Sequence, residues 1–288
     1  MQCAKRQWSK RPLLRKLGQM GSNGAPSGCP VLLLGFRLTA FHSDSFGIAA
    51  HMSSAPSSAS RSPTISNDDA RKLAVQDPAL HNAGLEAVRG ITPETLRIRF
   101  KQDRPWQHEM LGDGQFAGLE LPAAHVYKRA AVLVPLVVRD ALTLLLTQRP
   151  LHLKHHPGQI SFPGGRVEET DTDAIAAALR ETEEEVGLSR QHIELLGTLP
   201  PYHTVSNYAV TPVVALVQPP FTLRLDANEV ADAFEVPLDF ILDPANHEKR
   251  SRPWEGRERH FYAMPYGERF IWGATAAMLR NLYHFLRA

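Results

Sequence analysis

The chain has 288 residues, of which 43% are hydrophobic and 22% are charged, a composition typical of a soluble globular protein. No apolar run approaches the roughly 20 residues needed to span a bilayer, so we expect no membrane partner and a cytoplasmic location. The two cysteines, Cys3 and Cys29, both lie near the start. The rest of the chain therefore excludes a disulfide framework or a cysteine zinc site.

The formal net charge of +2 belongs to the first part of the chain. Residues 1–51 hold seven Lys and Arg residues and one acid, Asp44. Subtracting these from 32 basic and 30 acidic residues leaves 25 and 29, a net charge of −4. We therefore infer no nucleic-acid surface from the charge.

Residues 1–51 resemble no folded element. Residues 1–20 are basic and acid-free, as transit peptides are. An organelle presequence, a poor secretory signal and a wrongly chosen start codon all fit, and we favour the last. Met52 opens a Ser/Pro-rich stretch that is typical of a disordered amino terminus. We predict that residues 1–66 are disordered or are a mis-started leader.

Two short helical patterns follow, NDDARKLAV at 67–75 and TPETLRIRF at 92–100. We expect residues 67–125 to form a helical N-terminal extension that packs on the main domain. The texture of the sequence then changes, and residues 126–288 are predicted to be that main domain.

The main domain alternates strand and helix patterns. Apolar, β-branched runs predict strands at 130–139, 142–149, 193–200 and 210–218. A helix is predicted from about Asp173 to Val186, ended by Gly187. The tail at 266–286 is predicted to close with an amphipathic helix. This alternation indicates an α/β or α+β fold with a mixed sheet.

The helix before Gly187 carries the sequence RETEEEVGL. At about 100° per residue, Glu181, Glu184 and Glu185 share one side, whereas Glu183 points elsewhere and is predicted to be solvated. Converging carboxylates are unfavourable alone and favourable around a divalent cation. The predicted core face of this helix consists of Ile175, Leu179, Thr182 and Val186.

The stretch FPGGRVEETDTDAIAAALRETEEEVGL, which contains residues 164–188, resembles the Nudix box, G-x5-E-x7-R-E-U-x-E-E-x-G-U with U aliphatic. The matching residues are Arg180, Glu181, Glu184, Glu185, Gly187 and Leu188. Thr182 replaces an aliphatic residue, and the loop is one residue longer than the box. Counting from Gly165 places Asp171 at the first acidic position, whereas counting back from Arg180 places Thr172 there.

This resemblance implies an α/β/α sandwich and a pyrophosphatase that uses Mg²⁺ or Mn²⁺. It implies that Glu181, Glu184 and Glu185 bind the metal and that Arg180 orients them. Gly164 and Gly165 would let the backbone turn tightly beside the metal. A metal cluster there would neutralise charge on the leaving phosphate and activate water.

The preceding stretch, residues 145–165, resembles the signature of the coenzyme A pyrophosphatases, L-L-T-x-R-[S/A]-x3-R-x3-G-x3-F-P-G-G. Pro150 and Lys154 depart from that signature, and Lys154 keeps the positive charge of the usual arginine. The matching residues are Leu145, Leu146, Thr147, Arg149, Gly158, Phe162, Pro163, Gly164 and Gly165.

Other residues are candidates for substrate binding and proton transfer. Arg149, Lys154 and Arg166 flank the acidic site and could offset the charge of an anionic substrate. Tyr202 and His203 could line a pantetheine or adenine pocket. Glu229 is a candidate fourth carboxylate, either a further metal ligand or the general base.

We therefore predict a metal-dependent hydrolase that cleaves coenzyme A or acyl-CoA to 3′,5′-ADP and 4′-phosphopantetheine or its acyl form. One alternative is hydrolysis of another nucleoside diphosphate derivative, such as an ADP-sugar or a dinucleotide. The other is a Nudix-fold binding module without catalysis. The sequence leaves the oligomeric state open, including a homodimer.

Overall fold

The computed structural model describes residues 67–72, 88, 90–109, 112, 126–254 and 256–288. Every described residue belongs to one compact unit, Ser60–Ala288. The predictions made for residues 1–66 lie outside the described residues. Among the described residues, no helix is long and apolar enough to cross a membrane.

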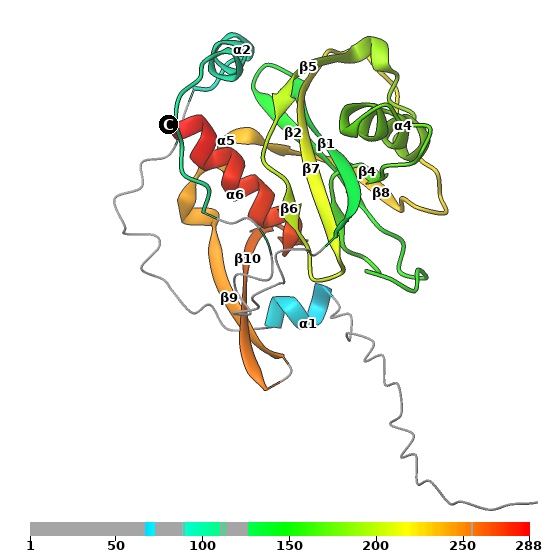
Figure 1. Cartoon of the computed structure of the whole chain (residues 1–288), viewed down its shortest axis with the longest axis vertical. Coiled ribbons are helices and arrows are strands. Elements are labelled where there is room, and N and C mark those ends of the chain that lie inside the picture. The colour runs from blue at the N-terminus through cyan, green and yellow to red at the C-terminus, as the bar shows by residue number, and fades with distance from the viewer. Residues whose placement is uncertain (1–66, 73–87, 89, 110–111, 113–125, 255) are drawn as a thin grey trace, which may run out of the picture. The chain divides into compact units, whose positions relative to one another are not determined.

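Within the described residues, a mixed sheet of eight strands is the main element (Figure 1). Its central strands run in the order β3-β2-β1-β7-β5, with β4 on β1, β6 on β7 and β8 on β2. The strands are β1 (Lys128–Val138), β2 (Leu142–Gln148), β3 (Ile160–Ser161), β4 (Gly164–Arg166), β5 (Ile193–Thr198), β6 (Tyr202–His203), β7 (Tyr208–Val217) and β8 (Asp232–Pro237). The four predicted strands correspond to β1, β2, β5 and β7.

A second sheet and several helices complete the described part of the chain. The smaller sheet has the order β11-β10-β9, with both pairs antiparallel. Its strands are β9 (Glu248–Trp254), β10 (Arg257–Tyr266) and β11 (Arg269–Trp272). The helices are α1 (Asn67–Lys72), α2 (Pro93–Lys101), α4 (Ala174–Val186), α5 (Leu238–Leu242) and α6 (Ala274–Arg287), with 3-10 turns at Arg190–His192 and Pro244–Asn246.

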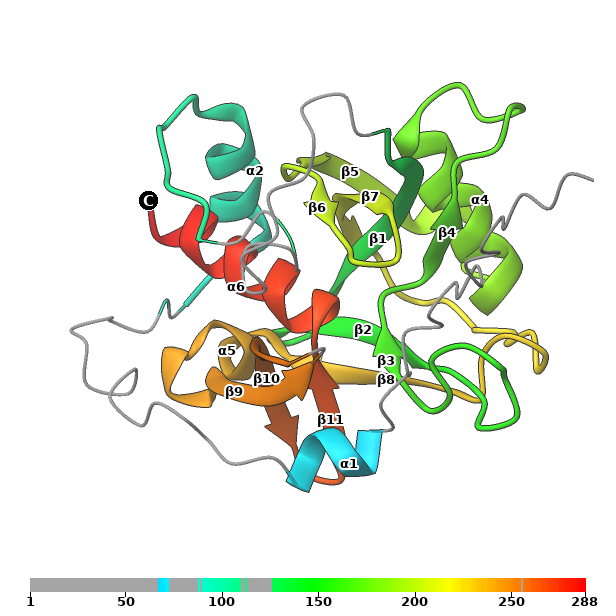
Figure 2. The ribbon, with the colours of Figure 1, turned by 60° about the horizontal axis from the view of Figure 1, so that its bottom comes forward.

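The parallel pair β1 and β7 lies at the centre, so its two faces are both buried. Successive side chains of a strand point to opposite faces. Leu133 and Val213 pack with Ala177 and Ala178 of α4, whereas Val134 and its neighbours pack with α5 and α6. The sheet therefore lies between α4 and the α5–α6 layer (Figures 1 and 2). This confirms the predicted α/β (α+β) sandwich with a mixed sheet.

The C-terminal helix α6 is the amphipathic helix that was predicted, but its polar side is buried as well. Nearly all of its side chains are buried, including the polar Arg280 and Asn281. The reason is that α6 is covered by the large sheet, by α5 and by the smaller sheet, which the sequence pattern did not indicate.

The helices before the main domain have contacts with it. In α2, Arg97 forms an ion pair with Glu194 of β5 at 2.7 Å, and Phe100 contacts the ring of Phe285 at 4.6 Å between centroids. In α1, Asn67 accepts a hydrogen bond from the Trp272 indole at 2.6 Å. The division of the chain at residue 126 stays a prediction.

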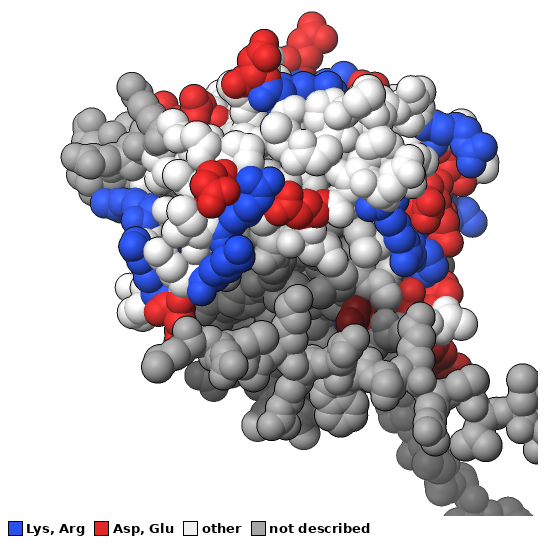
Figure 3. Space-filling model, turned by 90° about the horizontal axis from the view of Figure 1, so that it is seen from above, with Lys and Arg blue, Asp and Glu red and all other residues white. Residues whose placement is uncertain are grey.

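The face of the molecule seen from above carries charges of both signs. Figure 3 shows Lys and Arg side chains interspersed with Asp and Glu around a broad uncharged area. Elsewhere in the described residues, Arg97 pairs with both Glu94 and Glu194. Over the described residues of this face, the electrostatic field is therefore mixed in sign.

A polar cluster beside α6 is centred on the Arg280 side chain. Its guanidinium donates to both carboxylate oxygens of Glu109, which also accepts a hydrogen bond from the Tyr262 hydroxyl at 2.6 Å. Burial raises the pKa of Glu109, but hydrogen bonds from His284 and Arg280, the Arg280 charge and Tyr262 outweigh it and lower the pKa to about 2. The carboxylate is thus held in its charged form.

His247 lies on the other side of Arg280 and is held neutral. Its Nδ1 faces Arg280 Nη1 at 3.1 Å and its Nε2 faces the Ile241 carbonyl at 2.7 Å. Since Arg280 can only donate and the carbonyl can only accept, the proton belongs on Nε2. Burial, followed by the Arg280 charge, lowers the pKa of His247 to about 4 despite the hydrogen bond to Ile241.

Acidification should therefore destabilise the fold through His247. Between pH 6.5 and about 4, an unfolded chain binds a proton at this imidazole and the folded chain does not, so stability falls as the pH falls. The full shift corresponds to about 3 kcal/mol. Urea unfolding measured across this interval should show the decrease. Glu109 adds a further loss between pH 4.5 and about 2.

His247→Gln is the test variant, because an amide can accept from Arg280 and donate to Ile241 without titrating. Its free energy of unfolding should change less between pH 6.5 and 4 than that of the wild type. The control is His155→Asn at an exposed position. The change of its free energy of unfolding over this interval should equal that of the wild type. Equal slopes for His247→Gln and the wild type would contradict the assignment.

Candidate active site

Helix α4 begins and ends where its sequence dictates. The Asp173 side chain accepts a hydrogen bond from the Ala176 amide at 2.8 Å and caps the N-terminus. Gly187 ends the helix with a φ of 68°, which glycine adopts without strain. Thr182, the departure from the Nudix box, is fully buried, and its hydroxyl donates to the Ala178 carbonyl at 2.6 Å. The hydroxyl is thus satisfied in an apolar setting.

The buried face of α4 differs in part from the predicted one. Thr182 and Val186 are buried as expected, whereas Ile175 and Leu179 are half-buried. Small side chains allow α4 to approach the sheet closely, so its fully buried positions include Ala177 and Ala178. Glu185 is also buried, although it was assigned only to the carboxylate side.

The predicted metal-binding glutamates lie in three different environments. The Glu184 side chain is 60% exposed and that of Glu181 is 16% exposed, and Glu185 is 6% exposed. Glu183 is exposed, as predicted, and pairs with Arg190 at 3.6 Å. The four glutamates of this helix therefore do not form one solvated acidic face.

Glu185 contacts the glycine loop before the helix. One of its carboxylate oxygens accepts a hydrogen bond from the Gly164 amide at 3.0 Å. Burial raises the pKa of Glu185 to about 7, with the charges of Glu229 and Glu181 acting in the same direction, whereas the Gly164 bond and Arg149 oppose the shift. A buried carboxylate with one hydrogen bond and two negative neighbours is suited to binding a cation.

Glu181 lies against the second glycine of the loop. A Cβ at Gly165 would stand 2.6 Å from Glu181 Oε2, so a side chain at this position would displace the carboxylate from its place. Burial raises the pKa of Glu181, Arg180 opposes the rise, and the charges of Glu184 and Glu229 add to it. The glycine pair thus positions two of the three predicted ligands.

Arg180 lies between Glu181 and Glu184 and holds both. Its Nη1 donates to Glu181 at 3.1 Å and to Glu184 at 2.9 Å. Its Nε and Nη2 donate to the two oxygens of Asp171 at 3.1 and 2.9 Å, and Nη2 also contacts the Arg166 carbonyl. This bidentate pair fixes the guanidinium plane, which fits the predicted orienting role.

Asp171 was not among the predicted site residues, although its position was visible in the sequence. Counting from Gly165 places it at the first acidic position of the box. Its side chain is 5% exposed, and the hydrogen bonds from Arg180, followed by one from the Glu168 amide, lower its pKa. Of the two residues that the alignment with the box allowed at the first acidic position, Asp171 and Thr172, Asp171 is therefore the one that holds Arg180.

Replacing Asp171 should weaken the orientation of the glutamates. Asp171→Asn keeps the shape but loses one charge-assisted acceptor, so Arg180 is held less firmly. We expect activity to fall by about 10- to 100-fold, measured as kcat for a pyrophosphate substrate. The neighbouring exposed Glu169→Gln should keep wild-type activity. An unaltered kcat in Asp171→Asn would show that Arg180 needs no such partner.

Two further predicted residues approach this cluster from other elements. Glu229 is exposed in the loop between β7 and β8, where its amide donates to the Asp226 carbonyl at 3.0 Å. Its charge acts on both Glu181 and Glu185. Arg149 follows β2, and its charge opposes the pKa rise of Glu185. A fourth carboxylate and a cation thus act electrostatically on the glutamates of α4.

The other predicted substrate contacts are more dispersed. Lys154 is exposed in the loop between β2 and β3, and Arg166 is exposed at the end of β4. Tyr202 is 1% exposed within the core, so its side chain is not available to line a substrate pocket. His203 stacks on Tyr127 at 4.3 Å. It lies three strand spacings from β4, roughly 14 Å.

Among the described residues, no three His, Cys, Asp or Glu side chains lie close enough together to hold a metal ion. The donor chemistry nevertheless fits a hard cation, because the carboxylates at the site offer only oxygen. Two of them, Glu181 and Glu185, are held in surroundings that disfavour their own negative charge. A divalent cation such as Mg²⁺ or Mn²⁺ would relieve this.

Comparison with known proteins agrees with this fold. The family model described as NUDIX domain matches residues 127–255. The "Uncharacterized Nudix hydrolase NudL" of Escherichia coli O6:H1 is 43% identical over 156 residues, which cover 54% of this chain and 81% of that protein. NudL of Escherichia coli K12 gives the same values. These matches define an enzyme of the pyrophosphatase class. The chain belongs to the Nudix hydrolase family.

Solved structures show more distant similarity. The Ap4A hydrolase binary complex of C. elegans is 22% identical, with 40% of this chain and 85% of that chain covered and a TM-score of 0.33. A MutT/nudix family protein from Enterococcus faecalis is 18% identical, with 64% of each chain covered and a TM-score of 0.33.

Proposed function

We propose that this Nudix hydrolase cleaves the pyrophosphate of coenzyme A or acyl-CoA, releasing 3′,5′-ADP and 4′-phosphopantetheine or its acyl form. The observation that carries the proposal is the course of residues 145–165. This stretch resembles the coenzyme A pyrophosphatases, and it runs along β2, β3 and the start of β4 to the Gly164–Glu185 contact. The stretch that resembles the coenzyme A pyrophosphatase signature therefore ends at the glycine loop that contacts Glu185.

In this proposal some residues of the site bind the cation or the substrate, and others orient the metal ligands. Glu181, Glu184 and Glu185 would hold Mg²⁺ or Mn²⁺, with Arg180 and Asp171 fixing their geometry. The bound cation would neutralise the pyrophosphate and lower the pKa of the attacking water. Arg149 would offset the negative charge of the substrate at the same place.

Glu229 is our candidate for the general base. It is exposed in a loop, and its charge reaches Glu181 and Glu185. It would accept a proton from water as the water oxygen forms a bond to phosphorus. The bond from that phosphorus to the bridging oxygen then breaks, and the second phosphate leaves with the electron pair.

Lys154 and Arg166 are proposed to contact the anionic substrate from the rim of the site. Both are exposed and lie on the segments that enter and leave the glycine loop. The 3′-phosphate distinguishes coenzyme A from dephospho-coenzyme A. If either residue contacts it, Lys154→Ala or Arg166→Ala should raise KM for coenzyme A more than for dephospho-coenzyme A. The cytoplasmic location and the homodimer stay predictions.

Product analysis tests the proposed substrate. The purified full chain is incubated with Mg²⁺ or Mn²⁺ and coenzyme A, acetyl-CoA, ADP-ribose or NADH, and the products are separated by chromatography. Release of 3′,5′-ADP from coenzyme A or acetyl-CoA, well ahead of the other two substrates, is expected. Preferred cleavage of ADP-ribose or NADH would favour the ADP-sugar or dinucleotide alternative. No cleavage of any substrate would favour a binding module.

A further inference from the structure

The loop between β2 and β3, residues 149–159, carries two of the residues proposed to bind the substrate, Arg149 and Lys154. Lys154 and the two residues after it are exposed. The base of the loop is closed by the Arg149 amide, which donates to the Gln159 carbonyl at 2.9 Å. Gly158 is buried, so the loop returns to the body of the molecule at this residue. Contacts that hold Gly158 therefore also fix the path of the exposed part of the loop.

The backbone of this loop has a positive φ at two residues. His156 has a φ of 54° and Gly158 has a φ of 67°. Glycine adopts such an angle without strain, whereas at a residue with a side chain the angle is unfavourable. An unfavourable conformation persists where the surrounding structure holds it in place. An attachment from outside the loop is thus expected close to His156.

Asn67, the first residue of α1, provides such an attachment. Its Nδ2 donates to the Gly158 carbonyl, and its Oδ1 accepts a hydrogen bond from the Trp272 indole at 2.6 Å. Because an indole nitrogen can only donate, the oxygen of the Asn67 amide belongs on the Trp272 side. The amino group of the same amide is thereby directed toward the loop.

A second amide reaches the same carbonyl more weakly. Gln148 Nε2 lies 3.4 Å from the Gly158 oxygen, beyond the roughly 2.7–3.2 Å of a good N–H···O bond. Its Oε1 accepts from Arg269, which also pairs with Asp232. Asn67 is therefore the stronger of these two donors to the Gly158 carbonyl.

Helix α1 is itself attached to the smaller sheet, so Asn67 has a fixed support. Ala70 is fully buried and packs against Phe270 of β11. The Arg250 guanidinium of β9 donates to the Arg71 carbonyl at 2.5 Å. Figure 2 shows α1 beside β11. The loop between β2 and β3 is thus connected through Asn67 to the smaller sheet.

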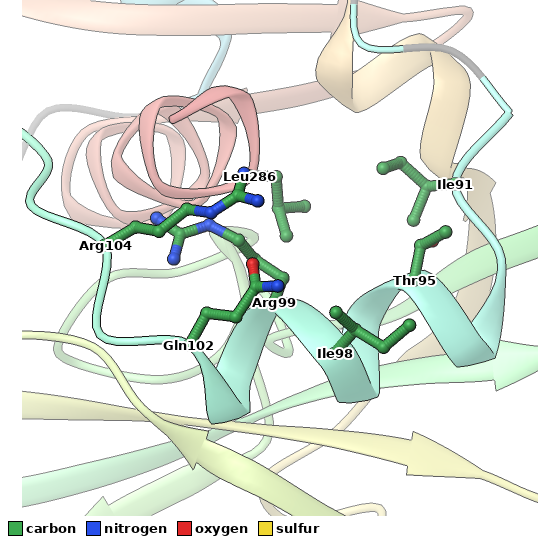
Figure 4. Close-up of a pocket in the computed structure, with 7 residues that line it drawn as sticks. All are labelled: Ile91, Thr95, Ile98, Arg99, Gln102, Arg104 and Leu286. Carbon is green, nitrogen blue, oxygen red and sulfur yellow. The ribbon is translucent and has the colours of Figure 1, made fainter.

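The other helix before the main domain, α2, contacts a different part of the structure. It packs against the C-terminal part of α6, and Ile91, Arg99 and Leu286 line the cavity between them (Figure 4). Its Arg99 donates to the Phe285 carbonyl of α6 at 2.8 Å. Of the two helices, α1 therefore supplies the support for the loop between β2 and β3.

We propose that Asn67 is a positioning residue for substrate binding, which holds the loop between β2 and β3 so that Arg149 and Lys154 face the substrate. This proposal rests on the proposed function, which assigns those two residues to the substrate. Asn67 and Trp272 lie outside the Nudix-family part of the chain, residues 127–255. Segments before and after the family domain thus hold its substrate loop.

Asn67→Asp separates the two hydrogen bonds of this side chain. The carboxylate has the size of the amide and still accepts from Trp272, but it has no hydrogen to donate to the Gly158 carbonyl. KM should rise by about 5-fold or more, the effect of losing one such bond. The kcat should change by less than about 2-fold, because the carboxylates of α4 are held by Arg180 and the glycine loop.

The kinetic comparison uses the substrate that the wild type cleaves best in the product analysis, so a wrong substrate does not obscure the role of Asn67. Limited digestion with trypsin gives a readout that needs no activity. Lys154 is the only trypsin site in residues 150–159, and Arg149 is followed by Pro150, a bond that trypsin does not cleave. Cleavage after Lys154 should be at least about 5-fold faster in Asn67→Asp than in the wild type, because the loop opens more often.

The matched control is Arg71→Ala, which removes a contact between α1 and the smaller sheet. Arg71 donates to the Glu268 carbonyl at 2.5 Å. KM, kcat and the rate of cleavage after Lys154 should stay within about 2-fold of the wild type, because the burial of Ala70 keeps α1 in place. Asn67→Ala loses both hydrogen bonds and should raise KM at least as much as Asn67→Asp. Thermal unfolding reports whether each variant is folded.

Three results would overturn the proposal. The first is a KM in Asn67→Asp equal to that of the wild type, whether or not trypsin cleaves the variant faster. The second is an equal rise of KM in Arg71→Ala and Asn67→Asp, which would show that the docking of α1 as a whole holds the loop. The third is an unaltered rate of cleavage after Lys154 in Asn67→Asp. This last result would count even if the wild type cleaved no substrate and the proposed function failed separately.

Discussion

Glu184→Gln should lower kcat for a pyrophosphate substrate by about 10³-fold and leave the fold intact. The amide has the size of the carboxylate but carries no charge, so it binds a divalent cation poorly. The Glu184 side chain is 60% exposed and pairs with Arg180 at 2.9 Å, so little of the folding energy depends on it. Steady-state kinetics and thermal unfolding measure the two effects separately.

The next residue toward the N-terminus supplies the control. Glu183 is also an exposed glutamate of α4, and it contacts Arg190 instead of Arg180. Glu183→Gln should keep wild-type kcat and a similar melting temperature. If both variants were fully active, the assignment of Glu184 to the metal would be wrong. If both were equally impaired, the charge of the helix as a whole, and not one ligand, would matter.

Alanine substitutions at the two loop glycines, Gly164 and Gly165, should affect stability and activity to different extents. A Cβ at Gly165 would overlap the carboxylate of Glu181, which is the mobile end of a long side chain. Gly165→Ala should therefore cost about 1 kcal/mol or less of stability. It should nevertheless lower activity by about 10²-fold, because displacing a positioned group by about 1 Å is enough for such a loss.

Gly164→Ala should lower the stability of the fold more than Gly165→Ala does. Gly164 has a φ of 147°, and a Cβ there would meet the Ala131 carbonyl and Val132 Cα, the latter at 2.6 Å. Backbone atoms of a central strand cannot move aside, so we expect a loss of about 3 kcal/mol. Thermal unfolding should show a melting temperature lower by roughly 6–12 °C.

Gly267→Ala distinguishes the clash from the backbone angle alone. Gly267 has a φ of 55°, and a Cβ there would have no neighbour within 4 Å, so only the left-handed conformation is penalised, by about 1 kcal/mol. A loss at Gly164 no greater than the loss at Gly267 would mean that the strand accommodates the methyl group. If Gly165→Ala were as active as the wild type, the Glu181 carboxylate would be able to move aside without losing its function.

Local signals in the sequence predicted the helix that carries the site. Asp173 and Gly187 are a capping acid and a left-handed glycine, and both act within a few residues of the helix they limit. The strands β1, β2, β5 and β7 were likewise predicted from apolar runs. The resemblance to the Nudix box led us to expect that Arg180 orients the three glutamates, and Arg180 donates hydrogen bonds to two of them, Glu181 and Glu184.

Burial could not be predicted in the same way, because it depends on distant segments. Glu185 is buried because the glycine loop reaches back to it across 21 positions. Tyr202 is in the core because β6 pairs with β7. The smaller sheet was missed because its strands mix charged and apolar residues, as in EKRSRPW of β9, without the long apolar run that predicted β1.

The burial of α6 has a consequence for how the protein is made. This helix covers one face of the large sheet, yet it is translated after every strand on which it packs. While the ribosome is still adding residues, Leu136, Leu144 and Leu216 of that face lack their cover. Exposed apolar strands of this kind are where nascent chains associate wrongly. Until α6 has been synthesised, this face of the sheet should therefore be open to association with other chains.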